Sequence, residues 1–151
     1  MNSDTLSNIQ NKWDSELCPI INGILFLNGQ LWSYDYLDIE IRGVSGRSVK
    51  LREVNPSQIS STVQFSTLTE RDTSLDIERG RIYSCGEGGF GSDGYVSCVN
   101  SNSGELEWIA FFEESNPFVL LKVMRDHIEA TNSHGHIWCF EKESPINIIV
   151  I

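Results

Sequence analysis

The sequence has few positive charges and no long hydrophobic run. Lysine and arginine number 11 among 151 residues, against 21 aspartates and glutamates, so the formal net charge is -10 at pH 7. Charge of this sign repels nucleic-acid phosphates and anionic membrane surfaces. No stretch approaches the roughly 18 apolar residues of a membrane span, and the N-terminus has neither region of a secretory signal. We therefore expect a cytoplasmic protein that binds neither nucleic acid nor membranes directly.

The cysteines form no C-x-x-C pair. The four cysteines are Cys18, Cys85, Cys98 and Cys139, each among apolar or aromatic neighbours. Such residues pack as small hydrophobic groups in a core. We expect reduced thiols, with a disulfide between Cys85 and Cys98 as the alternative.

A glycine-rich segment, 86–91, matches the pattern G-x-G-x-x-G. In a dinucleotide-binding fold, a loop of this type is followed by a helix, but none is expected after Gly91. The pattern also occurs in protein kinases, but the other sequence motifs of a kinase are absent here. Glu87 and Asp93 would also repel a phosphate. We expect a long, flexible hairpin loop between Cys85 and Tyr95, with an exposed Phe90 that contacts a partner.

No motif points to catalysis or to a bound cofactor. His134 and His136 could offer two metal ligands, with His127 or Asp126 as a third, but their segment has the character of a turn. There is no G-x-S-x-G elbow, and thiolates in buried strands are disfavoured. We therefore predict no enzyme activity, no catalytic residue, no metal and no cofactor. A small hydrolase with an unrecognised site stays an alternative.

The first 80 residues combine one helix with several strands. Apolar residues at helical spacing from Leu6 to Leu17 predict a short N-terminal helix. Asn28-Gly29 lies between two apolar runs and predicts a hairpin with a type I′ turn. Alternation of apolar with charged residues predicts half-exposed strands at 37–42 and 49–54, with a loop at 43–46. From residue 55 to 80 we expect one strand, around 62–65, and a loop over the polar run 70–76.

The rest of the chain is a regular series of apolar runs separated by turn signals. The predicted strands span residues 81–85, 95–100, 106–112, 118–124, 128–132, 136–140 and 147–151. The run 118–124 could be a helix, but its β-branched and aromatic content favours a strand. Short strands at this spacing are typical of an all-β domain built from hairpins. Residues 1–151 are expected to form one such domain.

Two segments, 93–108 and 128–140, share the form strand, glycine turn, strand. Asp93-Gly94 opens a strand, Ser103-Gly104-Glu105-Leu106-Glu107-Trp108 forms a turn, and Gly135-His136-Ile137-Trp138-Cys139-Phe140 forms a strand. Over residues 81–141, this succession of strands and glycine turns resembles the blades of quinoprotein-like β-propellers. Blades take about 40 to 45 residues each, so a closed propeller does not fit. The resemblance implies blade-like antiparallel meanders packed as a sandwich or an open barrel.

Negative charge is concentrated after residue 85, where 10 acidic and 3 basic side chains occur. An acidic protein without a catalytic motif is suited to a basic protein partner. In size, charge and lack of catalytic motifs, the chain resembles the small immunity proteins of bacterial toxin systems, including contact-dependent growth inhibition. That resemblance implies a 1:1 complex with a basic toxin, such as a nuclease domain. The predicted partner-binding residues are Glu87, Phe90, Asp93, Glu105, Glu107, Glu113 and Glu114. A structural or sensor module of propeller-like type is the alternative.

Overall fold

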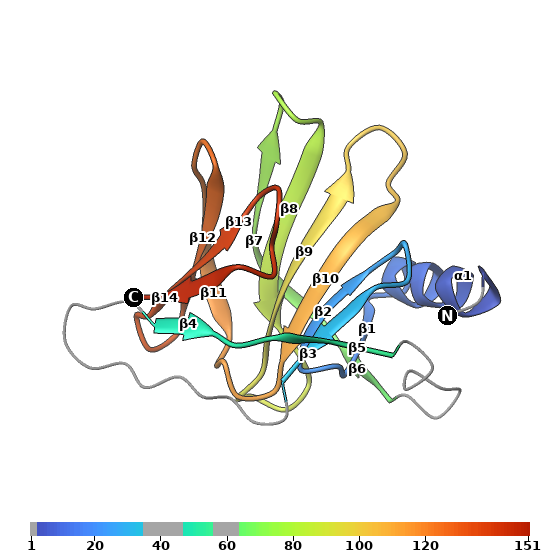
Figure 1. Ribbon diagram of the computed structural model, residues 1–151, viewed down its shortest axis with the longest axis horizontal. Helices are drawn as coiled ribbons and strands as arrows, with labels where there is room; N and C mark the ends of the chain where they lie inside the picture. Colours follow the sequence, from blue (N-terminus) through green and yellow to red (C-terminus); the bar gives the residue numbers. More distant parts are fainter. Residues whose placement is uncertain (1–2, 35–46, 56–63) are drawn as a thin grey trace.

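The computed structural model describes residues 3–34, 47–55 and 64–151. Within these residues it confirms an all-β fold with one short helix, α1 (Ser3–Asp14), and antiparallel strands in three sheets. The strand expected at 37–42, the loop expected at 43–46 and the start of the strand expected at 62–65 lie outside the described residues. Figure 1 shows the helix at one side of the molecule and the C-terminal strands at the other.

The largest sheet has seven strands in the order β5-β3-β2-β10-β9-β8-β7. Their bounds are β2 (Gly23–Phe26), β3 (Leu31–Ser33), β5 (Arg52–Val54), β7 (Thr69–Asp76), β8 (Arg81–Glu87), β9 (Gly94–Asn100) and β10 (Leu106–Phe112). Strands β7 to β10 follow one another both in sequence and in space, so they form a simple meander. The hairpin β2–β3 extends the sheet by pairing with β10.

The second sheet has five strands in the order β11-β12-β13-β14-β4. Their bounds are β11 (Phe118–Val123), β12 (His127–Asn132), β13 (Ile137–Glu141), β14 (Ile148–Val150) and β4 (Arg47–Val49). The first four form a second meander, and β11 confirms a strand where a helix was the alternative. The chain therefore makes two meanders in succession, β7–β10 and β11–β14.

The apolar faces of the two sheets meet in an aromatic layer. Trp138 lies at its centre, 4.9 Å between ring centroids from Phe112 and 5.4 Å from Phe118. Trp108 stacks on Phe140 at 6.1 Å, which links β10 to β13. Aromatic rings bury large areas and favour such tilted and edge-to-face contacts. This layer holds the two sheets together.

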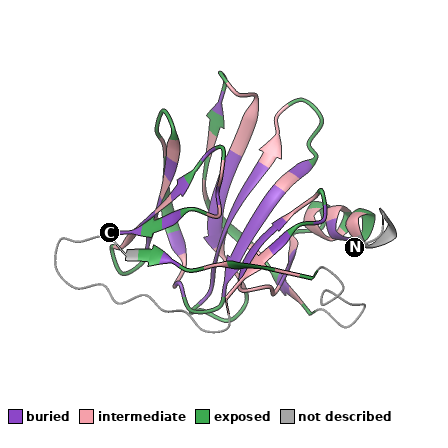
Figure 2. Cartoon of the chain, in the orientation of Figure 1, coloured by how far each residue is buried: buried purple, intermediate pink, exposed green. Residues whose placement is uncertain are grey.

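A second apolar cluster covers the opposite face of the seven-stranded sheet. It is formed under α1 and a two-stranded sheet, β1 (Leu17–Pro19) with β6 (Phe65–Thr67), and includes Ile9 and Tyr95. Trp13 of α1 meets the Tyr95 ring edge-on at 6.0 Å. Strands β9 and β10 are consequently buried on both faces, as Figure 2 shows along most of their length. This is why they consist of nearly continuous apolar runs.

The Asn28-Gly29 hairpin is confirmed, but the type I′ prediction is wrong. Of these two residues only Gly29 has a positive φ, 103°. The Gly29 amide donates to the Phe26 carbonyl, and the Phe26 amide donates to the Gln30 carbonyl. The loop thus has three residues and ends in a left-handed glycine, which is the next most common hairpin type. Residues 132–136 repeat the same arrangement around Gly135, which has a φ of 84°.

Two strand predictions in the first half need correction. The alternating segment 49–54 is not one strand, because β4 pairs with β14 and β5 pairs with β3, in different sheets. The chain crosses from one sheet to the other between Val49 and Arg52. The polar run 70–76 forms the edge strand β7, not a loop. Charged side chains are typical of sheet edges, where they discourage pairing with other chains.

All four cysteines are free thiols, and Cys18, Cys85 and Cys98 are buried as expected. The alternative disulfide does not fit the register, because Cys85 pairs with Val96 while Cys98 pairs with Tyr83. Burial, reinforced mainly by the charge of Asp72, raises the pKa of Cys85 to about 12. These thiols behave as core residues.

A buried ion pair joins the two sheets at one end. The Lys142 Nζ atom donates to Asp76 Oδ2 at 2.8 Å, and the two side chains are only 4% and 7% exposed. Asp76 ends β7, whereas Lys142 follows β13. Burial by itself raises the pKa of Asp76, but the hydrogen bond and charge of Lys142, together with Arg79, lower it overall.

Asp76→Asn should lower the free energy of unfolding by about 3 to 5 kcal/mol at pH 7, because it leaves a buried ammonium without its anion. The folded-state pKa of Asp76 lies below its unfolded value, so the stabilisation is complete above the unfolded pKa of about 4 and is lost as the pH falls below it. Urea unfolding of both proteins from pH 7 to pH 3 tests this.

Glu143→Gln is the matched control, since Glu143 is 72% exposed and should contribute no more than about 1 kcal/mol. A difference between wild type and Asp76→Asn that stays constant down to pH 3 would contradict the assignment.

Candidate functional site

The β8–β9 loop and the β10–β11 turn lie together at one end of the seven-stranded sheet. The Ser92 hydroxyl donates to the Glu113 carbonyl at 3.1 Å, and the Asn116 amide donates to the Ser92 carbonyl at 2.8 Å. Both connections therefore form one continuous surface. It carries four of the seven predicted partner-binding residues: Glu87, Phe90, Glu113 and Glu114.

The glycine-rich loop is organised by Asp93, which is fully buried. Its carboxylate accepts hydrogen bonds from the Gly88 amide at 2.9 Å and the Phe90 amide at 3.3 Å. The Gly89 amide donates to Ser66 Oγ at 2.8 Å, which ties the loop to β6. The carboxylate of Asp93, which the sequence predicts to bind a partner, therefore faces the protein's own loop.

The same contacts explain the glycine pattern without a phosphate. A Cβ atom at Gly88 would lie 2.3 Å from Asp93 Oδ2 and 2.7 Å from Ser66 Oγ, so a larger residue there would displace the two side chains that hold the loop. Phosphate-binding loops work by presenting free backbone amides. Here the amides of Gly88, Gly89 and Phe90 are already hydrogen-bonded within the protein. The loop is a rigid platform for Phe90.

Phe90 projects from this platform with 65% of its surface exposed. Glu113 and Glu114, in the adjacent turn, are also exposed. We call the surface formed by Phe90, Glu113 and Glu114 the Phe90 end. Glu87 lies beside it, but its carboxylate pairs with Arg71 at 2.7 Å. The net negative charge of this surface therefore comes from Glu113 and Glu114.

Asn22, which no sequence pattern singles out, positions Glu113. Its side-chain amide donates to Glu113 Oε1 at 2.7 Å and accepts from the Glu113 amide at 2.9 Å. The Tyr34 hydroxyl donates to Asn22 Oδ1 at 3.3 Å. Burial, followed by the charges of Glu114 and Glu113, raises the pKa of Tyr34. The phenol is therefore protonated and acts as a donor beneath the acidic surface.

Glu105 and Glu107 lie at the opposite end of the sheet, so the structure does not bring all the predicted residues together. Glu107 is half-buried and pairs with Arg81 Nε at 2.9 Å. It also accepts a hydrogen bond from the Cys98 thiol at 3.3 Å, and burial together with this carboxylate raises the pKa of Cys98. Glu107 is thus engaged within the protein.

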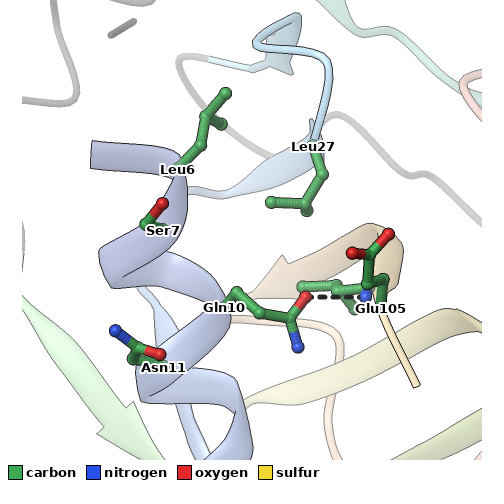
Figure 3. A pocket seen from close by; sticks show the side chains of 7 residues that line it. Leu6, Ser7, Gln10, Asn11, Leu27 and Glu105 are labelled. Atoms are coloured by element: carbon green, nitrogen blue, oxygen red, sulfur yellow. Dashed lines mark hydrogen bonds between the residues drawn. The ribbon is translucent and has the colours of Figure 1, made fainter. Parts of the chain in front are cut away.

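Glu105 is exposed and lines a pocket of about 340 Å³ between α1 and the β9–β10 turn. The pocket is lined by Leu6, Ser7, Gln10, Asn11, Leu27, Glu105 and Leu106. Figure 3 shows Gln10 reaching from the helix to this turn, where its Oε1 atom accepts from the Leu106 amide at 2.8 Å. The pocket therefore offers amides, a hydroxyl and one carboxylate beside apolar side chains.

The predicted turn role of His134 and His136 is confirmed. Their backbone amides donate to Asn132 Oδ1 at 3.0 and 2.9 Å, in the turn that joins β12 to β13. His127 lies elsewhere, beside Glu129 and Cys139 on adjacent strands. Sequence spacing missed this group, because its members are brought together by the pairing of β12 with β13.

Comparisons of the chain with protein-family models, curated proteins and solved structures found no significant match. In the part of the chain that the structure describes, no helix has the length and apolar character needed to cross a membrane. The fold and the side chains themselves are therefore the basis for any functional proposal.

Asp93→Ala should lower the free energy of unfolding by about 1 to 3 kcal/mol, because the Gly88 and Phe90 amides lose their acceptor. Hydrogen exchange at both amides should also accelerate. Glu105→Ala, which removes an exposed carboxylate at the other end, is the control and should change stability by no more than about 0.5 kcal/mol. Unchanged exchange at Gly88 would contradict the role of Asp93.

Proposed function

We propose that this protein is an immunity protein that binds and neutralises a basic toxin, with a nuclease domain as the target. The overall charge of -10 favours a basic partner over nucleic acid. The observation that carries the proposal is the Phe90 end, where two exposed carboxylates lie next to an exposed aromatic ring on a braced loop.

The carboxylates of the two ends differ in how they are paired. At the opposite end, Glu107 pairs with Arg81, Glu143 with Arg79 and Asp76 with Lys142. At the Phe90 end, no ion pair to Glu113 or Glu114 occurs among the described residues, and the Asn22 amide that holds Glu113 is neutral. Unpaired carboxylates keep their charge available to lysine and arginine side chains of another protein.

A nuclease holds phosphate groups with lysine and arginine side chains. Glu113 and Glu114 would occupy those cations in place of phosphate, and the opposite charges would accelerate association. Phe90 would supply the apolar anchor, since buried aromatic residues dominate many interfaces. Because Asp93 already orders the loop, little conformational entropy is lost on binding. The complex would contain one copy of each protein.

The gene neighbourhood offers the first test. The proposal expects an adjacent gene for a large secreted protein with a basic C-terminal domain. Expression of that domain should arrest growth, and co-expression of this protein should restore it. Growth arrest that persists with this protein present at equal or higher amounts would contradict neutralisation.

Glu113→Lys/Glu114→Lys should weaken binding to that toxin domain about 100-fold, because like charges would face each other across the interface. The salt dependence of the remaining affinity should flatten. Titration calorimetry at two salt concentrations measures both effects. Glu78→Lys/Glu105→Lys is the matched control, since it makes the same change in net charge with exposed residues of the opposite end. Equal losses in the two double variants would remove the Phe90 end from the interface.

Phe90→Ala should weaken binding about 30-fold, as expected for an aromatic anchor. Its effect on the free energy of unfolding should stay within about 0.5 kcal/mol, because the ring is 65% exposed in the free protein. Calorimetry and urea unfolding separate the two effects. Unchanged affinity would show that Phe90 is not an anchor.

A further inference from the structure

Three side chains of metal-binding type meet on the face of the five-stranded sheet that lies away from the aromatic layer. His127 and Glu129 alternate along β12 and so share a face, and Cys139 is the register partner of Glu129 on β13. His127 Nε2 lies 3.1 Å from Glu129 Oε2. The imidazole nitrogen, carboxylate oxygen and thiol sulfur all lie within 4.8 Å of one another.

Two of these three side chains, His127 and Cys139, border a hollow in the protein surface. A pocket of about 350 Å³ is lined by His127, Cys139, Glu141, Asn147, Ile149 and Ile151. Ile149 and Ile151 provide an apolar wall, although each keeps about half of its surface exposed, at 51% and 53%. The three residues are half-buried, and His127 and Cys139 face an open space that can hold an ion and a further ligand.

The charged side chains on the neighbouring strands do not prevent a cation from binding to this group. Lys122 is the register partner of Glu129 on β11, but no ion pair joins these two described residues. Glu141, the register partner of His127, accepts a hydrogen bond from Asn147 at 2.9 Å.

We propose that His127, Glu129 and Cys139 bind a divalent transition-metal ion of the zinc class. Imidazole and thiolate ligands suit zinc and cobalt, whereas magnesium and calcium require oxygen ligands. Zinc bonds of about 2.0 to 2.3 Å place tetrahedral ligand atoms about 3.3 to 3.7 Å apart. The His127 and Glu129 atoms lie slightly closer, at 3.1 Å, and the other pairs lie within 4.8 Å, so small side-chain movements would bring all three into range. On binding, the Cys139 thiol releases its proton to solvent and the thiolate sulfur bonds the metal. Water or Glu141 would complete the coordination.

The site is separate from the Phe90 end. Glu141 precedes Lys142, whose ion pair with Asp76 places this part of β13 at the opposite end of the molecule. Metal binding and toxin binding can therefore succeed or fail independently of each other.

Cobalt(II) is the most informative probe, because a bound thiolate gives a sulfur-to-cobalt charge-transfer band. Titration of the reduced, full-length protein should produce this band together with visible d–d bands of tetrahedral strength at one equivalent. Added zinc should abolish both, and zinc should raise the melting temperature. Absence of the charge-transfer band at saturating cobalt would overturn the proposal.

Single variants identify the ligands. Cys139→Ser should abolish the charge-transfer band, and His127→Gln and Glu129→Gln should each weaken zinc affinity more than the roughly 10- to 100-fold loss typical of outer-shell residues. His134→Gln is the matched control, because His134 is exposed in the β12–β13 turn. Circular dichroism and urea unfolding check that each variant is folded. A band that survives in Cys139→Ser, or equal zinc affinity in His127→Gln and His134→Gln, would overturn the assignment.

Discussion

The aromatic layer between the two sheets is the contact on which the other features depend. Trp138 packs against Phe112 and Phe118, and Trp108 packs against Phe140, so neither meander has to expose its apolar face. Because the meander β11–β14 follows directly after β10, only a short turn can connect the two sheets. That turn carries Glu113 and Glu114 and lies against the β8–β9 loop. The packing of the core thus creates the acidic end.

Charge is distributed unequally between the two ends of this sandwich. One end joins the sheets through ion pairs, of which Lys142 with Asp76 is almost fully buried. The other end keeps the charges of Glu113 and Glu114 at the surface. Asp93 shows that a carboxylate close to that surface can have a purely internal role, since its oxygens bind the loop amides. Internal pairing, more than sequence position, separates structural carboxylates from those available to a partner.

Local sequence patterns predicted most of the strands after residue 80. Each of these strands buries one or both faces, so its apolar residues follow a clear pattern along the sequence. They failed at β7, where an edge strand needs few apolar residues and its charges suggested a loop. They failed again at 49–54, where alternation continues although the chain passes between sheets. The hairpin at Asn28-Gly29 was predicted from this dipeptide between two apolar runs, but its turn type depends on how the strands pair.

The sequence by itself determined the all-β class, the helix, the hairpin positions and the acidic character, because composition and alternation are local properties. Tertiary structure decided which side chains meet. Glu129 and Cys139 are ten positions apart and come together only through the β12–β13 register. Asp93 and Phe90 lie three positions apart, yet one is buried and the other exposed. Register and burial are set by contacts between distant segments, and no local pattern carries that information.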